Sequence, residues 1–335
     1  MEVIVLKKWM KFTMPLLLCV AVISGCGGGN TDTGGKAAAN AGQENSQGAN
    51  TDSSATTEST GYVPDKLTVQ FVPSQNADTL EAKAKPLEKL LSDKIGIPVA
   101  VSVSTDYNTI VEAMASKKVD VGFLPPTAYV LAKERGAAEV ILQAQRYGVK
   151  DETGEPTDEL VDFYKAMMIV KKDSAIQSVA DLKGKKIAYQ NVSSSAGYVW
   201  PAAVLMDNGI DPLKDVEPIT VKGHDQAVLA VLNGDVDAAA IFQDARNVVK
   251  NDYPTVFEDT RVLTYTEEIP NDTITVRSDM SPEWIEKLQT AFIEIGQDEE
   301  GHKIISEIYT HEGYVKSDDS HFEIVREYGN KVKTE

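Results

Sequence analysis

Three consecutive serines, residues 193–195, stand between two segments of different character. The apolar run 186–189 before them is typical of a strand, and residues 200–206 after them are typical of a helix. Hydroxyl groups at a helix start lie beside unpaired backbone N–H groups and the positive end of the helix dipole. Such a turn can bind an oxyanion without a basic side chain. It can equally be an ordinary N-cap, so the segment alone leaves both interpretations open.

The first 26 residues have the pattern of a bacterial lipoprotein signal. Three lysines within residues 7–11 precede an apolar stretch, residues 14–23, which is too short to span a bilayer as a helix. Small residues then lead into Cys26. We expect the signal peptide 1–25 to be removed and Cys26 to be lipidated, which anchors the protein to the outer face of the cell membrane. The alternative is a plain secretory signal with an incidental cysteine.

Composition excludes several classes of protein. The chain has 335 residues, a formal net charge of −18 and two cysteines, of which Cys19 lies in the signal peptide. No disulfide is therefore expected within the mature chain, and its stability must come from an apolar core. The negative charge disfavours nucleic acid as a partner. No later stretch has the length and apolarity of a transmembrane helix, and no cofactor or metal ligand set is apparent.

The chain after Cys26 divides into a tether and a folded part. Residues 26–64 are rich in Gly, Ser, Thr, Asn and Ala and predict a flexible tether. Strands at 67–72, 98–103 and 119–124 alternate with helices at 79–95 and 107–116, which indicates an α/β sheet covered on both faces. We expect a first lobe over 65–165, a second over 166–268, and a return to the first lobe over 269–335. The returning segment carries amphipathic helices at 282–297 and 303–309.

An internal repeat supports two lobes. A helix beginning at Tyr107 precedes Asp120 by thirteen positions, and one beginning at His224 precedes Asp237 by thirteen. Ligands of open α/β sheets lie beyond the carboxyl ends of the strands. Two facing lobes, with chain crossings near 163–169 and 269–276 acting as a hinge, would bring seven residues into one cleft: Ser74, Tyr107, Thr127, Ser194, Ser195, His224 and Asp244.

Six segments together resemble a known family: residues 105–107, 118–129, 174–186, 194–201, 223–225 and 234–237. In this order they are similar to the phosphate/phosphite/phosphonate-binding family, which are type II substrate-binding proteins of ABC importers. The likeness covers about residues 67–315. It implies a two-lobed, periplasmic-binding-protein-like α/β fold with a hinge, no enzymatic activity, and delivery of a small oxyanion to ABC permease subunits in the membrane. We expect a monomer.

The resemblance also implies roles for individual residues. Ser194 and Ser195 match the hydroxyl turn that holds the phosphoryl oxygens, although Ala196 stands where the family usually has another serine. In the turn that carries Thr127, Pro125 likewise replaces the usual glycine of the family. The other implied ligand contacts are Tyr107, Thr127, Tyr164, His224 and Asp272.

Two other classes remain to be separated from an importer receptor. A serine hydrolase could use one of the three serines with His224 and an aspartate, but the turn lacks the Gly-x-Ser-x-Gly elbow. A ligand-sensing ectodomain would need a transmembrane helix to link it to a cytoplasmic partner, and the sequence shows no such helix. Asp120 and Asp237 are interpreted as caps at strand starts. The substituent on the phosphorus stays open, since Asp244 or Gln243 could meet an amine.

Overall fold

The computed structural model describes residues 61–151, 155–243 and 245–333. The signal segment, Cys26 and Asp244 lie outside these residues. Ordered contacts begin at Tyr62, three residues before the expected start at Asp65. The Tyr62 amide donates to the carbonyl of Asp279 at 2.7 Å, and its ring lies 3.6 Å from the guanidinium carbon of Arg277.

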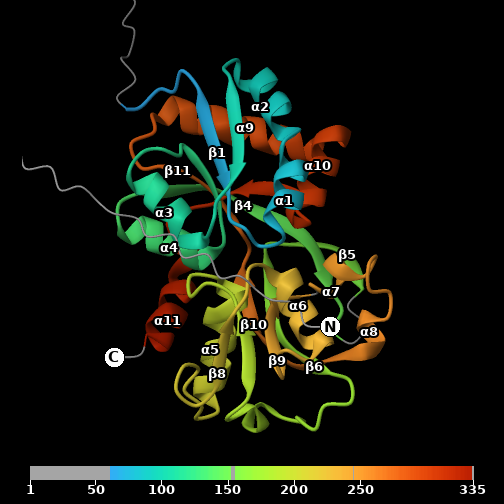
Figure 1. Cartoon of the computed structure of the whole chain (residues 1–335). Coiled ribbons are helices and arrows are strands. Elements are labelled where there is room, and N and C mark those ends of the chain that lie inside the picture. Colours follow the sequence, from blue (N-terminus) through green and yellow to red (C-terminus); the bar gives the residue numbers. More distant parts are fainter. Residues whose placement is uncertain (1–60, 152–154, 244, 334–335) are drawn as a thin grey trace, which may run out of the picture. The chain divides into compact units, whose positions relative to one another are not determined.

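The described residues form two sheets, each the centre of one lobe (Figure 1). The first-lobe sheet has seven strands, in the order β12-β4-β11-β3-β1-β2 with β5 paired to β4. The second-lobe sheet has five, in the order β10-β6-β9-β7-β8. The strands of the first sheet are β1 (Leu67–Phe71), β2 (Val99–Val103), β3 (Val121–Leu124), β4 (Ala138–Val149), β5 (Pro156–Val161), β11 (Thr273–Arg277) and β12 (Gly313–Lys316). Those of the second are β6 (Phe163–Lys171), β7 (Lys186–Tyr189), β8 (Glu217–Thr220), β9 (Ala238–Phe242) and β10 (Thr260–Pro270).

The two sheets repeat one topology. Strand β1 pairs in parallel with β2 and β3, and β7 pairs in parallel with β8 and β9. An antiparallel strand follows in each sheet, β11 beside β3 and β6 beside β9. The repeat seen in the sequence therefore corresponds to two similar lobes, and the prediction of a two-lobed α/β fold is confirmed.

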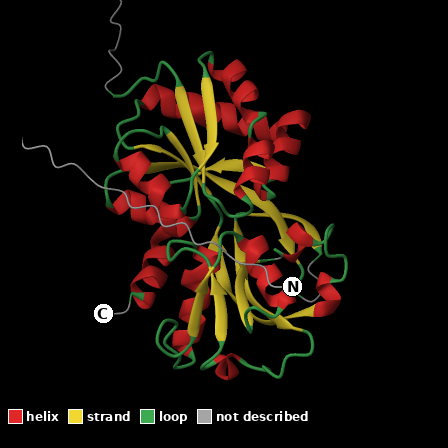
Figure 2. Cartoon of the chain, viewed as in Figure 1, coloured by secondary structure: helices red, strands yellow, loops and turns green. Residues whose placement is uncertain are grey.

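Helices cover both faces of each sheet (Figure 2). Those packed on the first sheet are α1 (Ala77–Ala84), α2 (Leu87–Ile95), α3 (Tyr107–Ala115), α4 (Pro126–Glu134), α9 (Pro282–Gln297) and α10 (Glu299–Tyr309). Those of the second lobe are η1 (Val179–Leu182), η2 (Ser195–Val199), α5 (Trp200–Asp207), α6 (His224–Asn233), α7 (Arg246–Val249) and α8 (Val256–Asp259). The single helix expected over 79–95 is wrong, because Pro86 interrupts it: proline has no N–H and clashes with the preceding turn.

The second sheet has an apolar core on each face, because successive side chains of its strands point to opposite sides. On β6, Met167 and Ile169 pack with α6, whereas Met168 and Val170 face the opposite side, where α5 lies. Successive side chains of a strand point to opposite faces, so one apolar run serves both cores. The core on the α5 side is continuous with that of the first lobe.

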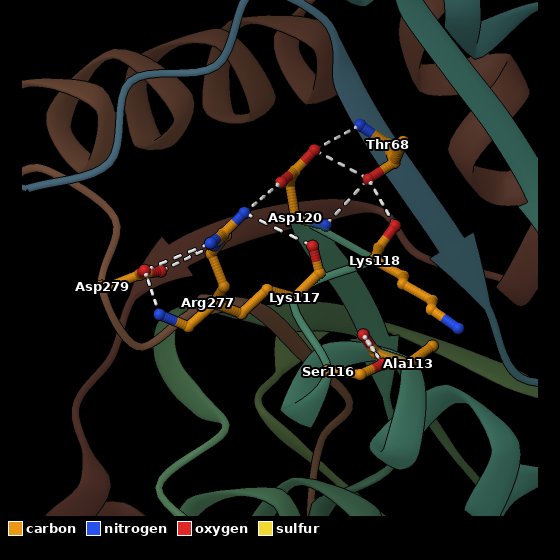
Figure 3. Close-up of polar contacts among 8 residues, drawn as sticks. All are labelled: Thr68, Ala113, Ser116, Lys117, Lys118, Asp120, Arg277 and Asp279. Atoms are coloured by element: carbon orange, nitrogen blue, oxygen red, sulfur yellow. Dashed lines mark hydrogen bonds and ion pairs between the residues drawn. The ribbon is translucent and has the colours of Figure 1, made fainter. Parts of the chain in front are cut away.

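Aspartates at corresponding positions tie neighbouring strands together where the strands begin. Asp120 accepts hydrogen bonds from the Thr68 amide at 2.8 Å and its hydroxyl at 2.7 Å, and from Arg277 at 3.3 Å (Figure 3). Asp237 accepts from the Lys186 amide at 2.8 Å. The interpretation of both aspartates as structural caps is confirmed.

The chain crosses between the sheets at two adjacent points. Phe163 at the start of β6 pairs with Pro270 at the end of β10, and the Asn271 amide donates to the carbonyl of Asp162 at 2.7 Å. Adjacent crossings of this kind let two lobes rotate about a common axis.

The C-terminal segment contacts both lobes. Helices α9 and α10 pack on the first lobe, as expected. The last elements, η3 (Asp319–Phe322) and α11 (Glu323–Val332), bridge the two: Phe322 packs edge-on against Tyr129 of α4, and Tyr328 stacks on Trp200 of α5 at 4.5 Å. Among the described helices, none has the length and apolarity needed to cross a membrane.

Candidate ligand-binding site

A cavity of about 50 Å³ lies where the carboxyl ends of strands from both lobes meet. A single water needs about 10–15 Å³ on this scale, so the space suits one small tetrahedral group. Six of the expected ligand residues line it: Ser74, Tyr107, Tyr164, Ser194, His224 and Asp272. Ser195 and Thr127 are not among the described lining residues; their hydroxyls are 2.8 Å apart, and Ser195 also lies beside the hydroxyl of Tyr164, which does line the cavity. Asp244 is outside the described residues.

The serine turn presents backbone donors as well as hydroxyls. Ser194 is the N-cap of η2, and its Oγ accepts from the Gly197 amide at 3.1 Å. The Tyr107 hydroxyl, from the other lobe, lies beside the Ser194 side chain, which partly offsets the rise in the Tyr107 pKa caused by burial. The amides of Ser195 and Ala196 donate to no other described residue. Since η2 continues into α5, these amides lie at the positive end of a helix, as the sequence predicts.

His224 is a neutral donor of defined tautomer. It is the first residue of α6, and its Nδ1 accepts the Phe242 amide at 3.1 Å. The proton must therefore be on Nε2. Burial lowers the pKa of His224 to about 3, so the ring is uncharged near neutral pH. The site thus gains an N–H donor without a fixed positive charge.

Asp272 is the acceptor of the site and is held by two basic side chains. Its Oδ2 lies 3.2 Å from Arg146 Nη2 and 3.5 Å from His311 Nε2, while its Oδ1 bonds to no described residue. Burial by itself would raise the pKa of Asp272, but the His311 hydrogen bond and the Arg146 charge outweigh it and lower the pKa. Asp272 is therefore ionised and can only accept hydrogen bonds.

Arg146 and His311 are site residues that sequence reasoning missed. Arg146 is buried, lies over the Tyr164 ring at 4.7 Å and lines the cavity from β4. His311 follows α10 and stands behind Asp272, with its Nδ1 3.2 Å from the hydroxyl of Tyr314. The sequence feature that could have indicated Arg146 is a basic residue at the end of the buried part of β4. This feature does not identify Asp272 as its partner, because Asp272 lies 126 residues further along the chain.

The cavity wall is electrically balanced. Arg146 and Asp272 are the charged groups among the described lining residues, and they neutralise each other. Burial raises the pKa of the tyrosines around them, so those hydroxyls remain protonated: Tyr107, Tyr164, Tyr309 and Tyr314. No cluster of three or more potential metal ligands occurs within the described ranges. The arrangement offers neutral donors, one carboxylate acceptor and one paired guanidinium.

Comparison with known proteins assigns the chain to a family. Residues 69–322 match the family model described as "ABC transporter, phosphonate, periplasmic substrate-binding protein". The chain belongs to this family. Its members are binding proteins, so the chain is not an enzyme, and the hydrolase alternative is discarded.

Individual relatives agree with this assignment. A phosphate-import protein of Mycolicibacterium smegmatis is 30% identical over 240 residues, covering 68% of this chain and 71% of that protein. The fold also matches solved structures. A binding component of a Pseudomonas aeruginosa phosphonate transporter has a TM-score of 0.68 at 23% identity, covering 78% and 85% of the two chains. PhnD1 of Prochlorococcus marinus, solved with methylphosphonate, has a TM-score of 0.68 at 19% identity, covering 81% and 99%.

Proposed function

We propose that this protein is the lipid-anchored receptor of an ABC importer and that it captures a small phosphorus oxyanion: a phosphonate, phosphite or phosphate. The observation that carries the proposal is the inter-lobe cavity, which combines the His224 donor and the serine turn with the Asp272–Arg146 pair. The ligand then passes to permease subunits when the lobes open. Cys26, once lipidated, keeps the receptor beside that permease.

The charges in the cavity favour a ligand that carries one negative charge and one proton. Because Arg146 is already paired with Asp272, no described lining residue offers an uncompensated positive charge to a dianion. Asp272 Oδ1 needs a donor, and the P–OH of a monoanion supplies it. The ionised oxygens of the same ligand accept from His224 Nε2–H and from the amides of Ser195 and Ala196. The ligand-binding side chains proposed here are those of Ser74, Tyr107, Tyr164, Ser194, His224 and Asp272, joined by Arg146 and by the backbone amides of Ser195 and Ala196.

The size of the cavity favours a compact substituent on phosphorus. About 50 Å³ accommodates the three oxygens and one further atom of phosphite, phosphate or methylphosphonate. A longer aminoalkyl chain would have to extend toward an outer groove lined by Gln243 and Asn247. We therefore expect methylphosphonate and phosphite to bind more tightly than 2-aminoethylphosphonate.

Calorimetric titration against a panel of five ligands tests the proposal. The panel consists of methylphosphonate, phosphite, phosphate, 2-aminoethylphosphonate and sulfate at pH 7. We expect saturable binding of at least one of the three compact phosphorus oxyanions and no measurable heat with sulfate. Binding of none of them, or tight binding of sulfate, contradicts the proposed function.

A further inference from the structure

A turn behind the cavity carries a second buried histidine. His311 follows helix α10 and is 2% exposed. The residue before it, Thr310, ends the helix with φ 58°, in the left-handed region that a β-branched side chain rarely adopts. Residues in such conformations persist where the surrounding structure fixes them, and they concentrate at ligand and active sites. Thr310 itself lines the cavity, so the strained turn lies at the proposed site, and His311 is the residue that it presents there.

Strand β4 fixes the position of His311. The Glu312 amide donates to the carbonyl of Gln145 at 2.7 Å, where β12 pairs with β4. Gln145 immediately precedes Arg146, so one strand positions both of the basic partners of Asp272. The His311 ring is therefore held beside the carboxylate.

The two ring nitrogens of His311 have different partners. Nε2 lies 3.5 Å from Asp272 Oδ2, and Nδ1 lies 3.2 Å from the Tyr314 hydroxyl. Asp272 is ionised and can only accept, so Nε2 must carry the proton. Burial lowers the pKa of His311, so the ring is neutral and Nδ1 accepts from Tyr314. A chain of donors therefore runs from Tyr314 through His311 to Asp272.

The surroundings of Asp272 leave one of its oxygens for the ligand. Oδ2 is shared by His311 and Arg146, whereas Oδ1 bonds to no described residue. The other titratable side chains near Asp272 are uncharged: His224, Tyr107, Tyr164, Tyr309 and Tyr314. A neutral His311 brings no charge of its own, so its contribution is directional. A carboxylate held at Oδ2 by two donors cannot rotate, whereas one held by Arg146 alone can.

We propose that His311 is the positioning residue of Asp272: its Nε2–H holds Oδ2, so that Oδ1 is presented to the cavity as a fixed acceptor for the P–OH of the ligand. His311 acts through Asp272 and is not among the described residues that line the cavity. The inference deepens the proposed function and rests on it for the identity of the ligand. Losing the His311 donor lets the carboxylate rotate, so the P–OH loses its aligned acceptor.

Two amide substitutions that differ in reach separate positioning from packing. The amide of a glutamine side chain reaches about as far as Nε2 of a histidine, whereas that of asparagine reaches only as far as Nδ1. His311→Gln therefore keeps an N–H donor for Asp272, and His311→Asn loses it. His302→Asn is the matched control, because His302 Nε2 also bonds to a carboxylate, Glu312 Oε2 at 2.6 Å, and neither residue lines the cavity.

Calorimetry with methylphosphonate and with phosphite measures the effect on binding. We expect His311→Asn to raise both dissociation constants by about 10-fold or more, because it removes a hydrogen bond to a charged group. His311→Gln should stay within about threefold of the wild type, and His302→Asn should change neither constant. Equal losses in the two His311 variants would show that His311 acts by packing alone and would overturn the proposal. Unchanged constants in His311→Asn would overturn it as well.

Carbon NMR of the Asp272 carboxyl group gives a second readout, which needs no ligand. Burial by itself raises the pKa of Asp272, and the His311 hydrogen bond opposes that rise. In ligand-free protein we therefore expect His311→Asn to raise the pKa of Asp272 and His311→Gln to keep it near the wild-type value. An equal pKa in the wild type and in His311→Asn would show that Nε2 does not donate to Asp272 and would overturn the proposal. If none of the phosphorus oxyanions binds the wild type, the proposed function fails, while this titration still decides the bond between His311 and Asp272.

Discussion

The guanidinium of Arg146 and the carboxylate of Asp272 form a largely buried ion pair, 3.2 Å apart, at the wall of the inter-lobe cavity. Arg146 comes from β4, and Asp272 lies just before β11, at one of the chain crossings. The pair therefore joins the proposed ligand site to the segment where the chain crosses between the two sheets. Removing one partner from a buried pair is costly because it leaves an uncompensated charge.

Replacing Arg146 should weaken ligand binding. In Arg146→Gln, His311 is the one remaining partner described for the Asp272 carboxylate. The negative charge of Asp272 is then no longer compensated, so it repels an anionic ligand more strongly. We expect the dissociation constant for methylphosphonate to rise by about 10-fold to 100-fold, with Arg146→Lys intermediate because lysine keeps the charge but not the planar stacking on Tyr164. Arg326→Gln is the control, since Arg326 pairs with Asp319 on the C-terminal segment and does not line the cavity. An unchanged constant in Arg146→Gln would exclude Arg146 from the site.

Replacing Asp272 should relax selectivity against sulfate. The carbonyl oxygen of Asp272→Asn can accept from Arg146 and His311, which places the amide NH₂ where the free Oδ1 stood. An NH₂ donates to an unprotonated oxygen, whereas a carboxylate only repels it. Titration at pH 7 should show sulfate binding in the variant and none in the wild type. Tight binding of sulfate by the wild type would refute the acceptor role of Asp272.

Local patterns in the sequence were enough to predict much of the fold. Strand and helix periodicity, together with the equal spacing from Tyr107 to Asp120 and from His224 to Asp237, predicted two lobes of one topology. The break between α1 and α2 is also encoded locally, by Pro86. The hydroxyl turn at 193–195 was predicted because its donors are adjacent in the chain.

The remaining features depend on contacts between distant segments. Arg146 meets Asp272, and Thr127 meets Ser195, only when both sheets have formed and the two lobes lie against each other. The C-terminal helix α11 likewise reaches the second lobe through Tyr328 and Trp200. Periodicity and residue type indicate each partner separately but not which residues will pair, so the sequence analysis did not identify Arg146 or His311.

The two strand-start aspartates offer a matched stability experiment. Asp120 is 3% exposed and is bonded to Thr68 and Arg277, whereas Asp237 is exposed and caps Lys186. We expect Asp120→Asn to lower the free energy of unfolding by about 1.5–3 kcal/mol, since it removes charge-assisted bonds at a buried site. Asp237→Asn should cost less than about 1 kcal/mol. Denaturant unfolding of both variants measures this, and equal losses would contradict the argument.

Membrane attachment through Cys26 is tested on the native protein. Mass spectrometry of the membrane-bound form should show an acylated cysteine at the N-terminus and no residues 1–25. Cys26→Ala should leave the signal peptide uncut by the lipoprotein route and prevent lipid attachment. An intact 1–25 segment on the mature, membrane-bound wild type would refute the proposed anchor.

Burial of His224 predicts a stability that falls in mild acid. The native ring has a pKa of about 3, while an unfolded histidine has one near 6.5. Between these values the unfolded state binds more protons than the native state, so the free energy of unfolding decreases as pH falls. From pH 7 to pH 5 the loss attributable to His224 is about 2 kcal/mol. The carboxylates whose pKa is lowered, such as Asp279 with a pKa of about 2, lose their contribution only at more acidic pH.

The variant His224→Asn isolates this effect, because its side-chain oxygen can accept the Phe242 amide in place of Nδ1 while carrying no titratable group. Urea unfolding at pH 8, 7, 6 and 5 gives the free energy of unfolding at each pH. Plotted against pH, the values for wild type and variant should run parallel from pH 8 to 7 and converge toward pH 5. The pH dependence that remains in the free energy of unfolding of the variant reports His311, whose pKa is also lowered by burial. Curves that stay parallel down to pH 5 would show that His224 is protonated, or exposed, in the native protein. The neutral donor that the proposed site requires would then be absent.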